Sequence, residues 1–526
     1  MKTLIIIIFF SNLLFSQEKE AKPEQKPFDL PEAIIYGNDQ LNIKSGFKRN
    51  PSNIPKLSAK ELDSLNSLEK VRPSILPVSN LPYIKNEKIV EKGYLLGSFG
   101  NFITSNIEGG YSTSINDFQL YLNGGFEQSR GHVNNAEYSK IKAKVFSDYI
   151  APDKYFIFGG SKTRTAVHFE NFNYTNYYVR NFESRNKVDF GANIDVDGNY
   201  EGFVFETGAG LNLMKTAGDS LDYSDKSLSG YLKVQNPYNK FNLGFNTEID
   251  LRSGNGIGNS YGLLEGIASY KTSIFELKAD LGYQIAEYYD GVRNGLKFDL
   301  NLNSNISNNL TFKTKLSSGI KRNFISKLNN MNRFINYDVN IDHTYNNLLL
   351  DVFLTYHKDV DFYSSVGVSY GSINRNLNFV NVDSSYFKPL YLDVNQLTFV
   401  FDGFYNINEI SSINYAIKYI SVVTDTLNKN NTYIPNFETE INYNLKLSNG
   451  LSGRVGLEFV GTRYADIENK VELSPFFNMN FELNYRFDKN LSIFANVENL
   501  FNQDIFIYNN YIERGFFGKV GVNYNF

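Results

Sequence analysis

From about residue 93 to the end of the chain, apolar and polar residues alternate in long runs. Between residues 275 and 285 every odd position is apolar, whereas Glu276 and Lys278 occupy even positions. The stretches 241–251 and 296–303 repeat the same pattern. A period of two is the side-chain period of a β-strand, so these runs predict strands with one apolar and one polar face.

The lengths of the strands and of their connections narrow the fold class. The expected strands run to about 10 to 14 residues, which exceeds the usual length in soluble sheets and suits a tilted membrane strand. Short and long connections alternate along the chain, as they do where the turns of an outer-membrane barrel lie on one rim and its loops on the other. The expected short connections are 115–117, 151–153, 197–199, 307–309, 448–450 and 488–490, and the expected long ones are 129–138, 170–186, 215–225 and 361–393.

About 22 strands fit between Tyr94 and Phe526 at a typical spacing for membrane hairpins. Lipid cannot form hydrogen bonds with a free strand edge, so the sheet must close on itself. We therefore predict an all-β fold, a transmembrane antiparallel β-barrel over residues 93–526. Its diameter of roughly 40 to 45 Å leaves a lumen that side chains cannot fill. The charges expected in the lumen, such as Lys278, Asp280, Lys297 and Asp299, should form a hydrated, mutually paired wall.

The first 92 residues have a different character. Residues 1–16 carry one lysine and an apolar run from Leu4 to Phe10, followed by the small Ser16. This pattern predicts a secretory signal peptide, because the run is too short to span a bilayer. Residues 17–92 are rich in charges and prolines and contain one helix signal, since Ser58 and Glu61 have the spacing of a capping box. We expect them to form a short plug or periplasmic segment.

Composition excludes several functional classes. The net charge is -4 and the basic residues are dispersed, which disfavours nucleic-acid binding. The chain has no cysteine, and its four histidines are scattered without metal-ligand spacing. No nucleophile motif and no phosphate-binding glycine loop is present. We therefore expect neither enzyme activity nor a metal or cofactor.

The expected long connections hold the candidate ligand-binding residues. Aromatic rings and guanidinium groups offer stacking faces and donors for sugars, peptides or anionic chelates. The alternative is that aromatic residues close to the strands belong to the interfacial girdle, which needs no ligand. The candidates are Tyr174, Tyr177, Tyr178, Arg180 and Arg185 in the first connection, and Tyr370, Arg375 and Tyr386 in the second.

The C-terminal 50 residues resemble the end of a TonB-dependent receptor barrel. The matching features are the aromatic strand end Tyr485–Phe487, the alternating strand 491–497 and the Asn499–Asn502 element, Asn-Leu-Phe-Asn. In that family the last strand ends on an aromatic residue that the barrel assembly machinery reads. The resemblance therefore implies an assembly signal in the last strand, carried here by Val520, Val522, Tyr524 and Phe526.

The resemblance extends weakly to the N-terminal segment. The sequence LPEAIIYGND at 30–39 resembles the start of the plug in that family, which implies TonB as a partner. The residues implied for TonB contact are Leu30, Ile34, Ile35 and Tyr36. Ile34 to Tyr36 could add as a strand to a partner's sheet, or they could tuck into the barrel mouth. Only about 75 residues precede the barrel, so the resemblance implies a reduced plug.

These observations predict a receptor-like barrel of the bacterial outer membrane that captures or passes a bulky solute. Its expected partners are outer-membrane lipids, the barrel assembly machinery and TonB. The alternative is a non-transporting barrel, a subunit or scaffold of an outer-membrane complex. In that case the lumen would be closed by the chain's own segment or by a surface or periplasmic partner protein.

Overall fold

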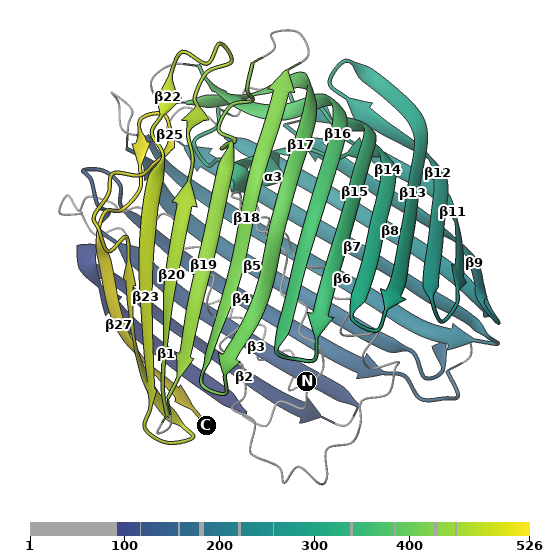
Figure 1. Ribbon diagram of the computed structural model, residues 1–526, viewed down its shortest axis with the longest axis horizontal. Helices are drawn as coiled ribbons and strands as arrows, with labels where there is room; N and C mark the ends of the chain where they lie inside the picture. The colour runs from purple at the N-terminus through teal and green to yellow at the C-terminus, as the bar shows by residue number, and fades with distance from the viewer. Residues whose placement is uncertain are drawn as a thin grey trace, which may run out of the picture.

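The protein is described by a computed structural model that covers residues 92–526 (Figure 1). The description leaves out 116, 156–157, 178–182, 219–221, 256, 337–339, 383–385, 425–428 and 448–449. The expected signal peptide, the segment 17–91 and the TonB-contact residues Leu30, Ile34, Ile35 and Tyr36 therefore lie outside the described residues.

One antiparallel sheet makes up the wall of the molecule (Figure 1). Its strands are β1 (Gly93–Gly100), β2 (Thr104–Ile115), β3 (Phe118–Ser129), β4 (Tyr138–Ile150), β5 (Lys162–Asn176), β6 (Glu183–Tyr200), β7 (Phe203–Gly218), β8 (Tyr223–Tyr238), β9 (Phe241–Gly254), β11 (Tyr261–Lys271), β12 (Phe275–Tyr288), β13 (Gly291–Ser307), β14 (Leu310–Lys321), β15 (Thr344–Lys358), β16 (Phe362–Asn381), β17 (Phe387–Asn408), β18 (Ser411–Thr424), β19 (Phe437–Lys446), β20 (Leu451–Val460), β23 (Phe476–Arg486), β24 (Leu491–Glu498) and β27 (Phe517–Asn525). The smaller elements are η2 (Asn101–Ile103), β10 (Ile257–Gly258), α3 (Ile325–Met331), β21 (Arg463–Tyr464), β22 (Glu472–Leu473), β25 (Phe506–Tyr508) and β26 (Tyr511–Ile512).

The wall closes where its first and last strands meet. β1 pairs with β27 in an antiparallel register that places Tyr94 opposite Asn525. The backbone N–H groups of Gly93 and Phe526 each donate to the other residue's carbonyl oxygen at 2.9 Å. The predicted fold is thus confirmed as a closed antiparallel barrel of 22 strands. Closure leaves no strand edge that lipid would have to satisfy.

The two faces of the wall differ in polarity as the alternation predicts. On the last strand Val520 and Val522 are exposed on the outside, and Leu95 of β1, which is paired with Tyr524, faces the same way. The opposite face is polar, and there the Tyr94 hydroxyl donates to Glu108 at 2.6 Å. No helix in the described part of the chain is long and apolar enough to cross a membrane. The apolar outer face and the polar lumen are those of a barrel set in the outer membrane.

The two rims differ in the length of their connections. The ends of β1 and β27 lie on the rim of the short turns, beside two-residue connections such as 239–240 and 409–410 (Figure 1). The opposite rim carries the longest connections, 322–343 and 499–516. In barrels of this type the rim with long loops faces the cell exterior.

Three predicted long connections were wrong because the strands are longer than expected; of the expected connection 215–225, only 219–222 lie between β7 and β8. The segment 361–393 is not a loop but belongs mostly to β16 and β17, so Tyr370 and Arg375 lie within a strand. The pairing register shifts between Ile373 and Asn376, and this bulge interrupts the alternation that would have marked a strand. The expected loop 170–186 is likewise mostly strand, because β5 runs to Asn176 and β6 begins at Glu183.

One predicted turn also lies elsewhere in the chain. The expected connection at 197–199 lies inside β6, and the chain turns instead at 201–202. Gly202 has a φ of 87° and Glu201 a φ of 48°. Two successive residues with positive φ are the geometry that a tight hairpin needs, and glycine adopts it without a steric penalty.

Candidate functional site

The largest buried cluster of the described residues lies across the exterior rim and not within the wall. We call this cluster the cap core. Its members come from strand ends and connections on opposite sides of the rim: Ala136, Tyr177, Met214, Tyr223, Ile325, Leu328, Phe334, Ile335, Phe379, Phe387, Tyr508 and Tyr511. The β5 and β6 strands stand on the opposite wall from β17 and β18 (Figure 1). Residues from both walls meet in one cluster, so the connections span the mouth of the barrel.

The connection between β14 and β15, residues 322–343, is the main element of this arrangement, and we call it the strap. It contains the short helix α3, which is drawn inside the barrel in Figure 1. Ile325 and Leu328 lie on one side of this helix and are 1% and 0% exposed. A helix of seven residues is not stable alone, so tertiary contacts must hold it in place.

Charged side chains from β8 and β9 hold the beginning of the strap. The helix has no side-chain cap of its own, and the buried Asp225 instead accepts a hydrogen bond from the Ser326 N–H at 3.0 Å. Arg252 pairs with the same carboxylate at 3.0 Å, and its guanidinium lies 3.9 Å from the centre of the Phe324 ring. Removal of one partner from a buried ion pair strongly destabilises the folded protein, because the other charge stays buried without compensation.

Polar side chains from β5 and β6 hold the middle of the strap. The Arg185 guanidinium, only 2% exposed, donates to the Ile335 carbonyl oxygen at 3.0 Å. The Lys187 ammonium donates to the Asn330 side chain at 2.6 Å. Both donors lie on luminal positions of β6, so the strap crosses the lumen to reach that wall.

The last part of the strap is fixed near β12 and β16. The Arg375 guanidinium pairs with Asp342 at 2.6 Å and lies 5.3 Å from the centre of the Tyr288 ring. The His343 ring also packs against Tyr288, with 5.0 Å between their centres. Burial lowers the pKa of His343 to about 4, so this imidazole is neutral at physiological pH.

A second connection, residues 499–516 between β24 and β27, reaches the strap from the other side. Its hairpin of β25 and β26 places Tyr511 against Phe334, with ring centres 3.6 Å apart. The Tyr508 hydroxyl donates to the Met331 carbonyl oxygen at 2.9 Å. The two longest connections therefore pack against each other above the lumen.

Ionisable groups in the exterior connections have pKa values that are shifted toward the neutral form. Burial, together with the nearby carboxylate of Glu458, raises the pKa of Glu513 to about 7. Burial lowers the pKa of Lys327 to about 8 and that of His132 to about 4. Each shift favours the neutral form, as expected where charge is incompletely hydrated.

The structure brings four of the predicted ligand-binding residues to the cap. Tyr177 lies in the cap core, and its hydroxyl donates to the Ile512 carbonyl oxygen at 3.1 Å. Tyr174 is buried and its hydroxyl donates to the Arg333 carbonyl oxygen at 3.5 Å. The Arg185 guanidinium lies 5.3 Å from the centre of the Tyr386 ring. These residues contact the strap or the cap core, and ligand binding by them stays a prediction.

The other predicted residues lie apart from this group. Arg375 is at the end of the strap, whereas Tyr370 is 41% exposed on the outer face of β16. Tyr178 and Arg180 lie outside the described residues. Sequence reasoning missed the strap itself, although the apolar positions 325, 328, 331 and 335 repeat at helical spacing between two strands and could have indicated an inward-facing turn of helix.

The luminal wall below the cap is lined with paired charges. Lys278 pairs with Asp280 at 2.8 Å, and Lys297 with Glu265 at 2.6 Å. Asp299 pairs with Lys315 at 2.8 Å. The predicted paired wall is therefore confirmed at these positions. Within the described residues, no group of three or more histidine or acidic side chains could hold a metal ion.

The closed antiparallel barrel of 22 strands is similar in fold to the barrels of several solved transporters and receptors. Among solved structures, the chain is similar to the copper transporter OprC, with 12% identity over 84% of this chain and 82% of that one and a TM-score of 0.66. It is also similar to the FrpB iron transporter from Neisseria meningitidis, with 10% identity over 82% of this chain and 81% of that one and a TM-score of 0.67.

A variant of the ferric enterobactin receptor PfeA from Pseudomonas aeruginosa is also similar, with 10% identity over 82% of this chain and 81% of that one and a TM-score of 0.64. No protein-family model matches the chain, and no curated protein matches its sequence. At identities this low, the similarity establishes the fold alone.

Proposed function

We propose that the protein is an outer-membrane receptor that captures a bulky solute and passes it through a gated barrel. The observation that carries this proposal is the cap core, in which connections from opposite walls meet across the mouth. A plain porin of this diameter would admit almost any solute, whereas a spanned mouth requires recognition or movement before passage. The paired, hydrated charges of the lumen suit a polar solute on its way through.

The structural neighbours agree with this proposal. OprC is named as a copper transporter, FrpB as an iron transporter and PfeA as a ferric enterobactin receptor. All of them combine a barrel of similar fold with transport or reception of a named solute.

We further propose that TonB energises passage through the segment that contains Leu30, Ile34, Ile35 and Tyr36. A short run of β-branched and aromatic residues suits strand addition to a partner's sheet edge. Residues 17–92 would then be the periplasmic segment on which TonB acts, whereas the cap closes the exterior mouth.

A second candidate function is a non-transporting barrel, a subunit or scaffold of an outer-membrane complex. The cap core also favours this candidate, because a permanently spanned mouth would suit a barrel closed by its own segments. The two candidates differ in whether an energy-transducing partner engages the chain.

Capture of the full chain by the periplasmic domain of TonB distinguishes them. We expect the detergent-solubilised chain to be retained, and Ile35→Pro to reduce retention at least about tenfold, because proline removes a backbone donor from the added strand. Asn38→Pro, just outside the apolar run, is the matched control and should bind as the unchanged chain does. Absence of capture, or equal capture of both variants, would favour the scaffold.

A further inference from the structure

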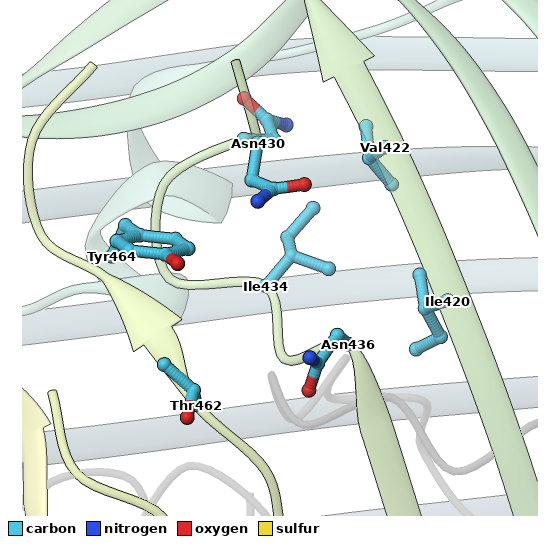
Figure 2. A pocket seen from close by; sticks show the side chains of 8 residues that line it. Ile420, Val422, Asn430, Ile434, Asn436, Thr462 and Tyr464 are labelled. Atoms are coloured by element: carbon cyan, nitrogen blue, oxygen red, sulfur yellow. The ribbon is translucent and has the colours of Figure 1, made fainter. Parts of the chain in front are cut away.

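A small cavity lies on the luminal side of β18, between two exterior connections (Figure 2). One connection supplies Asn431 and Ile434, and the other supplies Thr462 and Tyr464. The two connections are joined by backbone hydrogen bonds, since the Tyr433 N–H donates to the Tyr464 carbonyl oxygen at 2.8 Å. The cavity is therefore a built feature and does not depend on one flexible loop.

Asn431 is the most unusual residue of this cavity. Its side chain is 1% exposed, yet neither the amide nitrogen nor the amide oxygen has a hydrogen-bond partner among the described residues. Its backbone is fixed, because the Asn431 N–H donates to the Val422 carbonyl oxygen at 2.9 Å. A buried amide without partners costs roughly 1 to 3 kcal/mol, so its presence here points to a group that binds it.

The rest of the lining defines what such a group could be. All eight lining residues are uncharged. Thr462 and Tyr464 line the cavity together with the asparagines, whereas Ile420 and Ile434 provide an apolar surface (Figure 2). An ion would find no counter-charge here, and a purely apolar group would leave the amide unpaired.

The size of the cavity limits the ligand further. Its volume of about 40 Å³ accommodates roughly three water-sized groups. A hydroxyl group donates and accepts through one atom, so it can satisfy both atoms of the amide within this space. The adjoining carbon atoms would pack on the isoleucine side chains.

We propose that this cavity binds the hydroxymethyl end of an uncharged sugar, with Asn431 as the central hydrogen-bonding residue. The site lies on the exterior side of the barrel, where a solute arriving from outside would meet it. The inference goes beyond the proposed function, because binding in detergent does not require transport or TonB.

Saturation-transfer NMR on the detergent-solubilised full chain tests this site with D-glucose as the probe. We expect saturable transfer that is strongest at the C6 protons, with a dissociation constant on the order of millimolar for so small a contact. D-glucuronate has a carboxylate in place of the hydroxymethyl group and should bind at least about tenfold more weakly, because the site would bury an unpaired charge.

Asn431→Leu preserves the shape of the side chain and removes both polar atoms. We expect glucose affinity to fall at least about tenfold while the barrel still shows its heat-dependent shift in gel mobility. Gln119→Leu, an amide replaced in the same way near the opposite rim, should leave binding unchanged. If Asn431→Leu does not fold, Thr462→Val decides, with a loss of at least about threefold expected.

Several results would overturn the proposal. One is the absence of saturable glucose binding, and another is binding of glucuronate as tight as that of glucose. A third is undiminished glucose binding by a folded Asn431→Leu variant or, if that variant does not fold, by Thr462→Val. The first of these would show that the cavity serves only ordered water.

Discussion

Replacing Asp225 by alanine should release the strap from the wall of the barrel. The substitution removes the nearer of the two carboxylates that pair with the buried Arg252, leaving only Asp250 at 3.4 Å, and it removes the acceptor of the Ser326 N–H. Loss of one partner of a buried pair destabilises by about 3 to 5 kcal/mol. If the lost free energy is that of local opening of the strap, the backbone amides of the strap should exchange about a hundredfold faster or more. Hydrogen-exchange mass spectrometry on the detergent-solubilised protein measures this rate.

The control for this prediction is Asp148→Ala. Asp148 pairs with Lys162 at 3.0 Å, but both side chains are 25% exposed, so the pair should contribute only about 0 to 1 kcal/mol. Its removal should leave the exchange of the strap unchanged. Equal exchange in the unchanged chain and in Asp225→Ala would contradict the role of Asp225 as an anchor.

A charge on the outer face of the last strand should destabilise the barrel. Val522 lies midway along β27 and is exposed on the outside. Val522→Arg should lower the free energy of unfolding in lipid vesicles by about 2 to 4 kcal/mol, because the charge would lie near the middle of the bilayer. Guanidinium titration of the barrel refolded in vesicles measures this difference.

The matched variant is Asn523→Arg, one position further along the same strand. Its side chain belongs to the luminal face, and an arginine there is long enough to carry its charge past the buried Asn523 amide oxygen into the lumen, so stability should change by about 0.5 kcal/mol or less. If both substitutions had the same effect, the assignment of the two faces of β27 would be wrong.

The wall could be predicted from sequence because its rules are local. A period of two assigns each side chain to a face, and the need to close a sheet in lipid pairs the last strand with the first. Gly93 and Phe526 meet as this argument requires, although 432 residues separate them. The lipid-facing side of Val520 and Val522 follows from the same alternation.

The cap could not be predicted in this way because its contacts join residues far apart in the chain. Asp225 and Ser326 are 101 positions apart, and α3 carries no capping residue of its own that would announce it. The chemistry of Arg185 and Tyr386 makes them ligand-binding candidates, but no local pattern in the sequence predicts that they contact each other. Their contact, like the anchoring of the strap, is a product of tertiary packing.

Single-channel conductance in planar bilayers tests most directly whether the cap closes the barrel. The three proteins to compare are the full chain, a variant lacking residues 17–92, and that variant with residues 324–341 replaced by a short Gly-Ser linker. We expect the first two to remain closed and the third to show large, steady conductance. A large conductance on removal of residues 17–92 alone would contradict the claim, because the cap would then not close the mouth.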